Sequence, residues 1–387
     1  MYDVIVVGAG PGGASVAYFL GRAGMRVLVL EKEMLPRYKP CGGGLSLRML
    51  EKYFPFSFEP VIEERMNQIS YALGSRTLSI PLPDHSMAMV MRDKFDQFIL
   101  SHAQAEVEQG TAVQDVIEYP ESVAVKTKEV KSYECRFLIG SDGASSIVAK
   151  SLGLRRSKVL AAAIEAEAQV TEDVLRRFQA VPLFIFGELR TGYLWIFPKA
   201  DHLSVRVAAL RLKPGELQAS LHRVMSRYGI NLESTRLYGH PLPIYTGRER
   251  IATSRVLLIG DAAGLVDPFS GEGIRLAIKS GNLAATSILT NQIERYPHWA
   301  DKQIGSSQTL ALALGQLFYS FPRACFNLGV RNPLATKAVM ALLSDQIGYG
   351  QVIMRLFGTL PYSLLMRGIQ SLFKHSDDRR YERNTVA

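Results

Sequence analysis

Four glycines close to the N-terminus have the spacing of a loop that binds the phosphates of a dinucleotide. They lie between an apolar run and a helical pattern, and they are Gly8, Gly10, Gly12 and Gly13. In a Gly-x-Gly-x-x-Gly loop, the first glycine permits a tight turn, the second lets a pyrophosphate approach the backbone, and the third lets strand and helix pack closely. The helix that follows directs free N–H groups and a partial positive charge at the phosphates. The stretch therefore predicts a nucleotide cofactor.

A carboxylate and a second glycine-rich segment narrow the choice of nucleotide. Glu31 directly follows the apolar run Arg26–Leu30, where its side chain can accept hydrogen bonds from a ribose diol. Much later, Asp261 follows another apolar run, and an aspartate there can bind the ribityl hydroxyls of FAD, which NAD lacks. Gly271 and Gly273 leave room for a flat ring against the backbone. A helix that begins near Gly273 would direct its positive end at the flavin edge where reduced flavin carries negative charge.

The loop Cys41–Gly44 supplies the candidate catalytic residue. The Cys41 thiol can help to position the flavin ring or a proton source, and the alternative is a small buried side chain without a chemical role. The cysteines have neither metal-site nor disulfide spacing, so no metal is expected and a reducing compartment is indicated. These cysteines are Cys41, Cys135 and Cys325.

Continuous apolar runs predict strands buried on both faces of a parallel sheet. They lie at Val4–Val7, Arg26–Leu30 and Arg255–Ile259. A helical pattern over Ala14–Ala23, closed by Gly24, follows the first run, so the chain opens as a βαβ unit. A fold that gathers the three glycine-rich segments around one cofactor is therefore predicted.

The predicted fold is α/β, with a discontinuous Rossmann-type FAD-binding domain and a second, antiparallel-sheet substrate domain. At 387 residues the chain is long enough for both. We expect the FAD-binding domain to comprise 1–60, 91–155 and 250–295. We expect the substrate domain over 61–90 and 156–249, a helical C-terminal region over 296–375 and a polar tail over 376–387.

The composition is ordinary for a globular protein, with 47% hydrophobic and 21% charged residues. A net charge of +9 suits anionic partners such as phosphate-bearing cofactors or an acidic membrane surface, although it is equally compatible with a role in solubility. We recognise no nucleic-acid-binding module, so nucleic acid is not an expected partner. A strand pattern begins almost at Met1, and no apolar run reaches about 18 residues. We therefore expect a cytoplasmic protein without a signal peptide or a transmembrane helix.

The stretch Gln308–Phe373 is rich in Leu, Phe, Met and Tyr. It contains several basic residues but a single acidic residue, Asp345. Apolar helices with basic residues suit a surface that lies among anionic lipid headgroups. A peripheral membrane protein is therefore expected. The alternative is a helical subdomain packed on the core or against a second subunit, and the oligomeric state stays open.

Together these motifs resemble the geranylgeranyl reductase family of flavoproteins, within the larger p-hydroxybenzoate hydroxylase-like group. The match runs from the N-terminus to about residue 285. Arg92 with Asp96 matches a family motif, as does Asp142-Gly143. The elements that distinguish the family from hydroxylases and halogenases are Pro40–Gly43 and Tyr193–Lys199.

The resemblance implies a set of cofactor contacts. It places Glu31, Arg92 and Asp261 against FAD. It also places along the cofactor Lys32, Cys41, Gly42, Gly44, Val113, Asp142, Gly271, Gly273 and Ile274. The chain has one Gly-x-Gly-x-x-Gly motif. Either NADPH therefore binds transiently as the electron donor, or another reductant reduces the flavin.

Tyr193 and Trp195 are the expected substrate residues. They alternate on a predicted strand, so both face one way and can line an apolar slot, although two core aromatics would show the same spacing. Relatives usually carry Gly-x-Gly in the next strand. Here Arg206 and Ala208 stand at those places, which leaves the identity of the substrate open.

The activity implied by the resemblance is reduction of double bonds in a geranylgeranyl or other prenyl group, carried by chlorophyll, a lipid, a quinone or a diphosphate. An isolated alkene has no carbonyl to polarise it, so its reduction needs a hydride from reduced FAD and a proton in a dry pocket. One alternative is an FAD-dependent monooxygenase of an aromatic or polyene substrate. Another is a flavin-binding scaffold that has lost catalysis.

Overall fold

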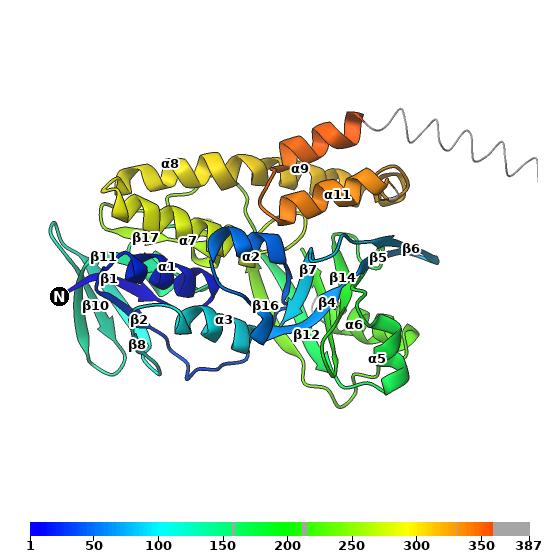
Figure 1. The fold of residues 1–387 in the computed structure, drawn as a ribbon, viewed down its shortest axis with the longest axis horizontal. Coiled ribbons are helices and arrows are strands. Elements are labelled where there is room, and N and C mark those ends of the chain that lie inside the picture. The colour runs from blue at the N-terminus through cyan, green and yellow to red at the C-terminus, as the bar shows by residue number, and fades with distance from the viewer. Residues whose placement is uncertain (157–158, 211–214, 331, 359–387) are drawn as a thin grey trace, which may run out of the picture.

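The computed structural model describes residues 1–156, 159–210, 215–330 and 332–358 (Figure 1). The expected tail and the part of the expected helical region after residue 358 lie outside the described residues. Figure 1 shows one sheet beside the N-terminus, a second sheet at the opposite end of the molecule, and a layer of helices running along both.

The first sheet forms from the apolar runs that the sequence indicates. Its strands are hydrogen-bonded in the order β8-β2-β1-β11-β10-β9, and β17 also pairs with β11. The parallel part comprises β1 (Tyr2–Val7), β2 (Val27–Leu30), β8 (Glu106–Glu108), β17 (Val256–Leu258) and the end of β11 (Ser132–Gly140). Antiparallel to β11 lies β10 (Val123–Thr127), followed by β9 (Val113–Glu118). The predicted buried strands of a parallel sheet are thus confirmed.

Helices cover this sheet and lead into its loops. The predicted first helix is confirmed as α1 (Pro11–Arg22), which packs against α3 (Arg92–Ser101) and α7 (Ile274–Leu289). Gly12 and Gly281 let α1 and α7 approach closely, because a Cβ at Gly281 would lie 3.1 Å from the Gly12 carbonyl oxygen. α1 begins four residues after the end of β1, whereas η2 (Gly260–Ala263) and a loop separate the end of β17 from α7.

The second sheet is almost entirely antiparallel, as predicted, with the order β16-β12-β15-β14-β13-β5-β6. The exception is the parallel pair β5–β13, which joins an early segment of the chain to the later strands. The strands are β5 (Gln68–Leu73), β6 (Arg76–Pro81), β12 (Leu160–Ala168), β13 (Leu183–Phe186), β14 (Gly192–Pro198), β15 (Leu203–Ala209) and β16 (Tyr238–Pro243). Apolar side chains of one face pack against α5 (Glu172–Phe178) and α6 (Glu216–Arg227).

A small third sheet connects the two halves, with the order β3-β7-β4. Its strands are β3 (Gly44–Ser46), β4 (Ile62–Met66) and β7 (Met87–Val90). Its strands come from segment 1–60, expected in the FAD-binding domain, and from segment 61–90, expected in the substrate domain. The predicted helix after the glycine-rich loop is α2 (Leu47–Tyr53), whose first turn is capped by the Ser46 hydroxyl at 3.4 Å from the Met49 nitrogen.

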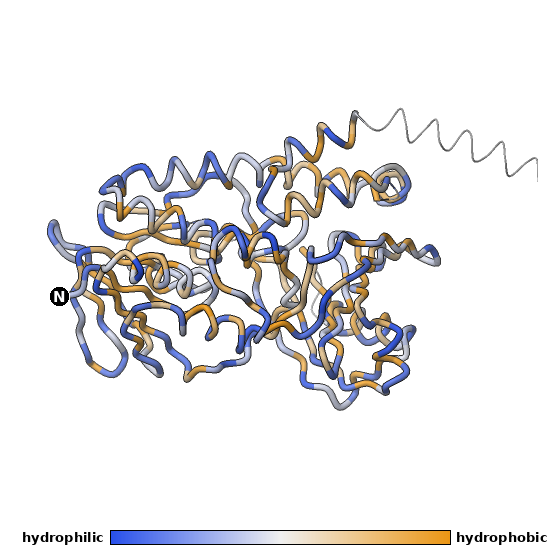
Figure 2. Tube along the Cα trace, in the orientation of Figure 1, coloured by the Kyte–Doolittle hydropathy of each residue, from blue (hydrophilic) through white to orange (hydrophobic). Residues whose placement is uncertain are grey.

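The C-terminal part is helical, as predicted, and it passes from the first sheet to the second (Figure 1). Its elements are α8 (Tyr296–Ala300), η4 (Asp301–Gly305), α9 (Ser306–Ser320), α10 (Pro322–Cys325), η5 (Phe326–Val330) and α11 (Pro333–Leu343). Figure 2 shows that the early turns are hydrophilic and the later helices hydrophobic. None of the helices among the described residues is long and apolar enough to span a bilayer.

Candidate functional site

The glycine-rich loop between β1 and α1 has the geometry of a phosphate cradle. Gly8 has a φ of +97°, and a Cβ at Gly13 would lie 1.9 Å from the Gly8 carbonyl oxygen, so neither position accepts a side chain. Gly10 precedes α1, and within the described part of the chain no side chain caps this end or places an acid in its first turn. The backbone N–H groups of the helix are therefore available to an anion.

Two arginines stand above this loop. The Nη2 atoms of Arg37 and Arg92 each lie 3.9 Å from the position that a Gly10 Cβ would take. Asp96 holds both guanidinium groups, because its carboxylate accepts from Arg92 Nε at 2.8 Å and from Arg37 Nη1 at 3.2 Å. Sequence reasoning found Arg92 but missed Arg37, which belongs to an irregular loop. A helix N-terminus below two fixed cations fits a pyrophosphate.

Glu31 is buried at the entrance of the same loop. Its carboxylate accepts from the backbone N–H groups of Ala9 at 2.7 Å and Glu33 at 3.1 Å, and Arg37 Nε lies 3.7 Å away. Lys32, in contrast, points into solvent and pairs with Glu33 at 3.8 Å. Val113 begins β9 and is buried. Contacts of these residues with a cofactor stay predictions.

Asp142 uses its carboxylate to cap a helix. It accepts from the Ser146 hydroxyl at 2.5 Å and the Ile147 N–H at 2.6 Å, at the start of α4 (Ile147–Ser151). Its backbone lies against the first glycine of the loop, since a Cβ at Gly8 would be 3.1 Å from the Asp142 Cα. The Asp142 backbone therefore packs against Gly8, and its carboxylate is occupied by the start of α4.

Asp261 and the start of α7 face each other across a narrow space. Asp261 lies in η2 (Gly260–Ala263), and a Cβ at Gly273 would be 3.4 Å from its Oδ1. The first turn of α7, from Ile274 onward, carries no acid, but the Glu272 carboxylate just before the helix accepts from the Arg275 N–H at 2.6 Å. The helix dipole directs partial positive charge at this end, and the stabilisation of a reduced flavin there stays a prediction.

The electrostatic field between these elements is positive. Burial raises the pKa of the Asp261 carboxyl, and Lys39 and Arg92 oppose that rise. Burial and the neighbouring Arg92 lower the pKa of Lys39 to about 8. Burial, together with Lys39 and Arg206, lowers the pKa of His240 to about 3, so its imidazole is neutral at pH 7. Such a field suits a polyanionic cofactor.

The loop that contains Cys41 is fixed by a buried lysine. Lys199 is 1% exposed, and its ammonium donates to the carbonyl oxygens of Gly42 at 2.7 Å and Val90 at 2.8 Å. A Cβ at Gly42 would lie 2.6 Å from the Trp195 ring. The loop therefore lies flat against the aromatic strand β14, and the half-buried Cys41 faces the space beside it.

That space is a cavity of about 750 Å³ between the second sheet, the segment 267–274 and the C-terminal helices. Such a volume is within the range of ligand pockets, ~300–1,000 Å³. Trp195 stacks on Phe197 with ring centroids 4.3 Å apart, and the Tyr193 hydroxyl donates to the Ser270 carbonyl oxygen. Much of the wall is aromatic or aliphatic, contributed by Ile69, Tyr71, Phe184, Phe186, Tyr193, Trp195, Phe269, Leu314, Phe318, Val339 and Leu343.

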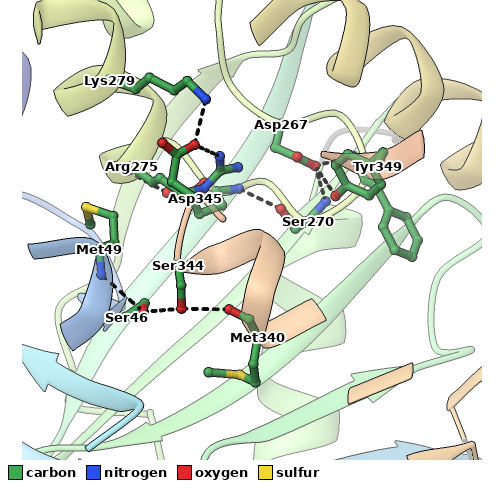
Figure 3. Close-up of polar contacts among 12 residues, drawn as sticks. Ser46, Met49, Asp267, Ser270, Arg275, Lys279, Met340, Ser344, Asp345 and Tyr349 are labelled. Carbon is green, nitrogen blue, oxygen red and sulfur yellow. Dashed lines mark hydrogen bonds and ion pairs between the residues drawn. The ribbon is translucent and has the colours of Figure 1, made fainter. Parts of the chain in front are cut away.

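The helices that close the cavity are held in place by polar contacts, which Figure 3 shows. Tyr349 donates to Asp267 at 3.1 Å, next to the glycine-rich segment. The Asp345 carboxylate accepts from Lys279 at 2.6 Å and lies 3.5 Å from Arg275. Ser46 and Ser344 share a hydrogen bond of 2.8 Å. Asp345, the single acidic residue of Gln308–Phe373, thus forms ion pairs with other elements of the same chain.

The described residues fit FAD. The uncapped N-terminus of α1, the two arginines over the first loop, the buried carboxylate of Glu31 and the half-buried carboxylate of Asp261 lie along one path. That path leads from the first sheet to Cys41 and the cavity. The contacts of these residues with FAD stay predictions.

Comparison with known proteins agrees with an FAD site. A family model described as "FAD binding domain" matches residues 1–291. A geranylgeranyl diphosphate reductase of Synechocystis sp. is 28% identical over 351 residues, which cover 82% of this chain and 85% of that protein. A menaquinone reductase of Mycolicibacterium smegmatis is 30% identical over 324 residues, which cover 76% of this chain and 78% of that protein.

Solved structures share the fold. A geranylgeranyl bacteriochlorophyll reductase-like protein from Thermoplasma acidophilum superposes with a TM-score of 0.74 at 22% identity, covering 94% of this chain and 98% of that one. The halogenase PltM superposes with a TM-score of 0.70 at 18% identity, covering 89% and 82%. At these identities the likeness establishes the fold, and it confirms the predicted α/β class.

Proposed function

Because this chain belongs to the geranylgeranyl reductase family of FAD-binding oxidoreductases, we propose that it saturates double bonds of a geranylgeranyl or other prenyl group. The observation that carries the proposal is the largely apolar cavity beside Cys41 and the α7 N-terminus. A prenyl chain is a flexible hydrocarbon with methyl branches, and an aromatic-walled cavity of this size suits it. The prenyl group can belong to chlorophyll, a lipid, a quinone or a diphosphate.

The proposed cofactor contacts follow the geometry. The N–H groups at the start of α1, with Arg37 and Arg92, would hold the pyrophosphate of FAD. Glu31 would bind the ribose and Asp261 the ribityl hydroxyls. The α7 N-terminus would face the edge of the flavin that becomes negative on reduction. Bound FAD would supply the hydride for the double bond.

The residues of this chain provide the environment for that transfer. The walls formed by Trp195 and Tyr193 exclude water from the reacting double bond. Lys199 holds the Cys41 loop at a fixed distance from β14, so the Cys41 thiol has a defined position at the cavity wall. We propose that Cys41 helps to position the substrate or the proton source. NADPH or another reductant would reduce the flavin.

A membrane surface is the proposed source of substrate. Large apolar side chains are exposed on the described C-terminal helices next to the cavity, namely Leu310, Leu317, Phe321, Leu334, Met354 and Phe357. The same helices carry basic residues such as Arg323 and Lys337. Together with the net charge of +9, this pattern favours contact with anionic lipid.

An anaerobic reoxidation experiment tests the proposed reaction. The holoenzyme is reduced with dithionite, geranylgeranyl diphosphate or a geranylgeranyl quinone is added, and flavin absorbance is followed together with product mass. We expect flavin reoxidation with a gain of two mass units for each double bond reduced. The proposal fails if the flavin stays reduced with every prenyl acceptor.

The same experiment separates the alternative reaction. The halogenase likeness reflects the fold and gives no specific support for oxygen chemistry in this chain. A monooxygenase would leave the reduced flavin unchanged under argon. On admission of oxygen, it would add one oxygen atom to an aromatic or polyene substrate.

A further inference from the structure

A buried charge pair crosses the second sheet at the edge of the cavity. Glu165 on β12 lies opposite Arg206 on β15, and Arg206 lies opposite Trp195 on β14. Directly opposed residues in antiparallel strands point to the same face, so the three side chains form one row. Glu165 is 1% exposed and Arg206 is 7% exposed. Arg206 stands where the family resemblance implies a glycine.

The two side chains leave most of each other's hydrogen-bonding groups without a partner. Arg206 Nη1 lies 3.7 Å from Glu165 Oε2, which is an ion pair but longer than a hydrogen bond. Among the described residues, Arg206 Nε and Nη2 have no hydrogen-bond partner, and neither do the two carboxylate oxygens of Glu165. A buried polar group without a partner is unfavourable, and such groups are uncommon in folded proteins. The free donors of Arg206 therefore indicate a missing acceptor.

The position of Arg206 shows where that acceptor would lie. Arg206 lines the cavity beside Cys41 and Trp195, with its guanidinium carbon 5.9 Å from the centroid of the Trp195 ring. Ala208, two residues along the same strand, also reaches the wall. A ligand in the cavity therefore lies beside the Arg206 guanidinium, close to the loop that we place beside the flavin, and the buried Nε and Nη2 atoms reach it when the side chain turns toward the cavity.

The local charges select the kind of acceptor. When its carboxyl is ionised, Glu165 offsets the charge of Arg206. The other arginine on the described cavity wall, Arg275, is compensated by Glu272 at 3.1 Å and by Asp345 at 3.5 Å. A diphosphate would need several uncompensated cations, whereas a carbonyl oxygen needs only donors.

We propose that Arg206, held by Glu165, binds a neutral carbonyl oxygen of the prenylated substrate inside the cavity. This inference rests on the proposed function and deepens it, because it selects a prenylated quinone or ester over a prenyl diphosphate. Arg206 acts as a specificity residue: it fixes one end of the substrate, and the prenyl chain then extends along the aromatic wall. A glycine at this position would offer no donors, so the site would not discriminate between substrates by the group at that end.

Ligand titrations of the oxidised holoenzyme at pH 8.5, where the Glu165 carboxyl is ionised, test the inference without turnover. Four probes carry the same geranylgeranyl chain and end in a naphthoquinone, an acetate ester, a diphosphate or a hydrogen atom. Each dissociation constant is read from the change in flavin absorbance. We expect the wild type to bind the quinone, the ester or both at least tenfold more tightly than the diphosphate, and the better of the two identifies the source of the carbonyl.

Variants assign the selectivity to the charge pair. Arg206→Met removes the donors but keeps the bulk, so affinity for the carbonyl probe should fall tenfold or more, and affinity for the hydrocarbon much less. Arg206→Lys should restore part of the loss. Glu165→Gln removes the compensating charge, so the ratio of diphosphate to carbonyl affinity should rise at least tenfold. Arg223→Met, on the exposed face of α6, serves as the matched control.

The inference is overturned if the wild type prefers the diphosphate, or if Arg206→Met weakens all four probes equally or none of them. Flavin content and thermal unfolding of each variant identify misfolding, and the double variant Glu165→Gln/Arg206→Met keeps the site neutral if the single variant is unstable. Failure of the proposed reaction would appear separately, as absence of reoxidation despite measurable binding.

Discussion

At the scale of single residues, this site depends on side chains that are absent as much as on those present. Gly42 allows the Cys41 loop to lie directly on the ring of Trp195, and Gly13 allows α1 to begin against Gly8. Buried polar groups then hold the backbone in place, as Lys199 does for the loop. Changes at such positions test geometry and charge separately.

Gly42→Ala should destabilise the protein and disturb the cavity. The added Cβ would lie 2.6 Å from the Trp195 ring and 2.7 Å from the Phe197 ring, which are packed against each other. Overpacking of this kind typically costs ~1–3 kcal/mol. Urea unfolding with bound flavin measures the loss. Gly239→Ala is the matched control, because a Cβ there would have no neighbour within 4 Å. Equal stability of the two variants would contradict the packing argument.

Glu165 should make stability depend on pH. Burial raises the pKa of its carboxyl to about 7, although Arg206 opposes the rise. The folded state therefore binds the proton more tightly than the unfolded state does. The associated stabilisation is complete below the unfolded pKa of roughly 4.3, and is lost as pH rises through about 7.

Glu165→Gln removes this dependence. Between pH 5 and 8, the wild type should lose stability relative to the variant by on the order of 2–4 kcal/mol, since one pKa unit corresponds to about 1.4 kcal/mol. Urea unfolding of both proteins across this range provides the difference, and the exposed Glu172→Gln is the control. A constant difference between wild type and Glu165→Gln would show that the carboxyl titrates normally.

At the scale of elements, the contacts between helices and loops determine whether the cavity is closed. Asp345 joins the end of α11 to α7 through Lys279 and to α2 through Lys52 at 2.5 Å. Attraction by Lys279 and Lys52 outweighs the effect of burial and lowers the pKa of Asp345. The carboxylate therefore remains charged and paired at neutral pH.

Asp345→Asn should loosen the helices over the cavity. Breaking a buried ion pair costs roughly 3–5 kcal/mol, and we expect the lower part of this range because Lys52 is half-exposed and can return to water. Hydrogen exchange should rise in residues 333–358 and 267–274, and much less in the first sheet. Asp301→Asn, which loses only a pair at 3.8 Å to Arg248, is the control. Unchanged exchange in both segments would show that other contacts fasten the helices.

The elements also show what the sequence can and cannot reveal. Val4–Val7 and Arg26–Leu30 were identifiable because a strand buried on both faces needs an unbroken apolar run. Arg37 was not, since its position over Gly10 depends on the path of an irregular loop. Likewise, the pairing of Glu165 with Arg206 arises from the register of β12 and β15, and register across strands leaves no local pattern.

At the scale of the whole molecule, the proposed prenyl substrate needs a route into the cavity. Apolar side chains on the described C-terminal helices remain exposed, with Phe321 61% and Phe357 66% accessible. Both side chains also line the cavity. An amphipathic surface there would let a prenyl chain pass from a bilayer into the protein without crossing water.

Vesicle flotation tests this arrangement. The wild type should float with vesicles rich in phosphatidylglycerol, less with phosphatidylcholine, and less again in 1 M salt, where screening acts within about 3 Å. Transfer of each Phe from water contributes ~1.5–3 kcal/mol, so Phe321→Ser/Phe357→Ser should lower vesicle binding at least tenfold. Met34→Ser removes a side chain that is 69% exposed but distant in sequence from the C-terminal helices, and it should have no effect. If both variants float like the wild type, the exposed helices serve another contact, and the substrate must be delivered by a different route.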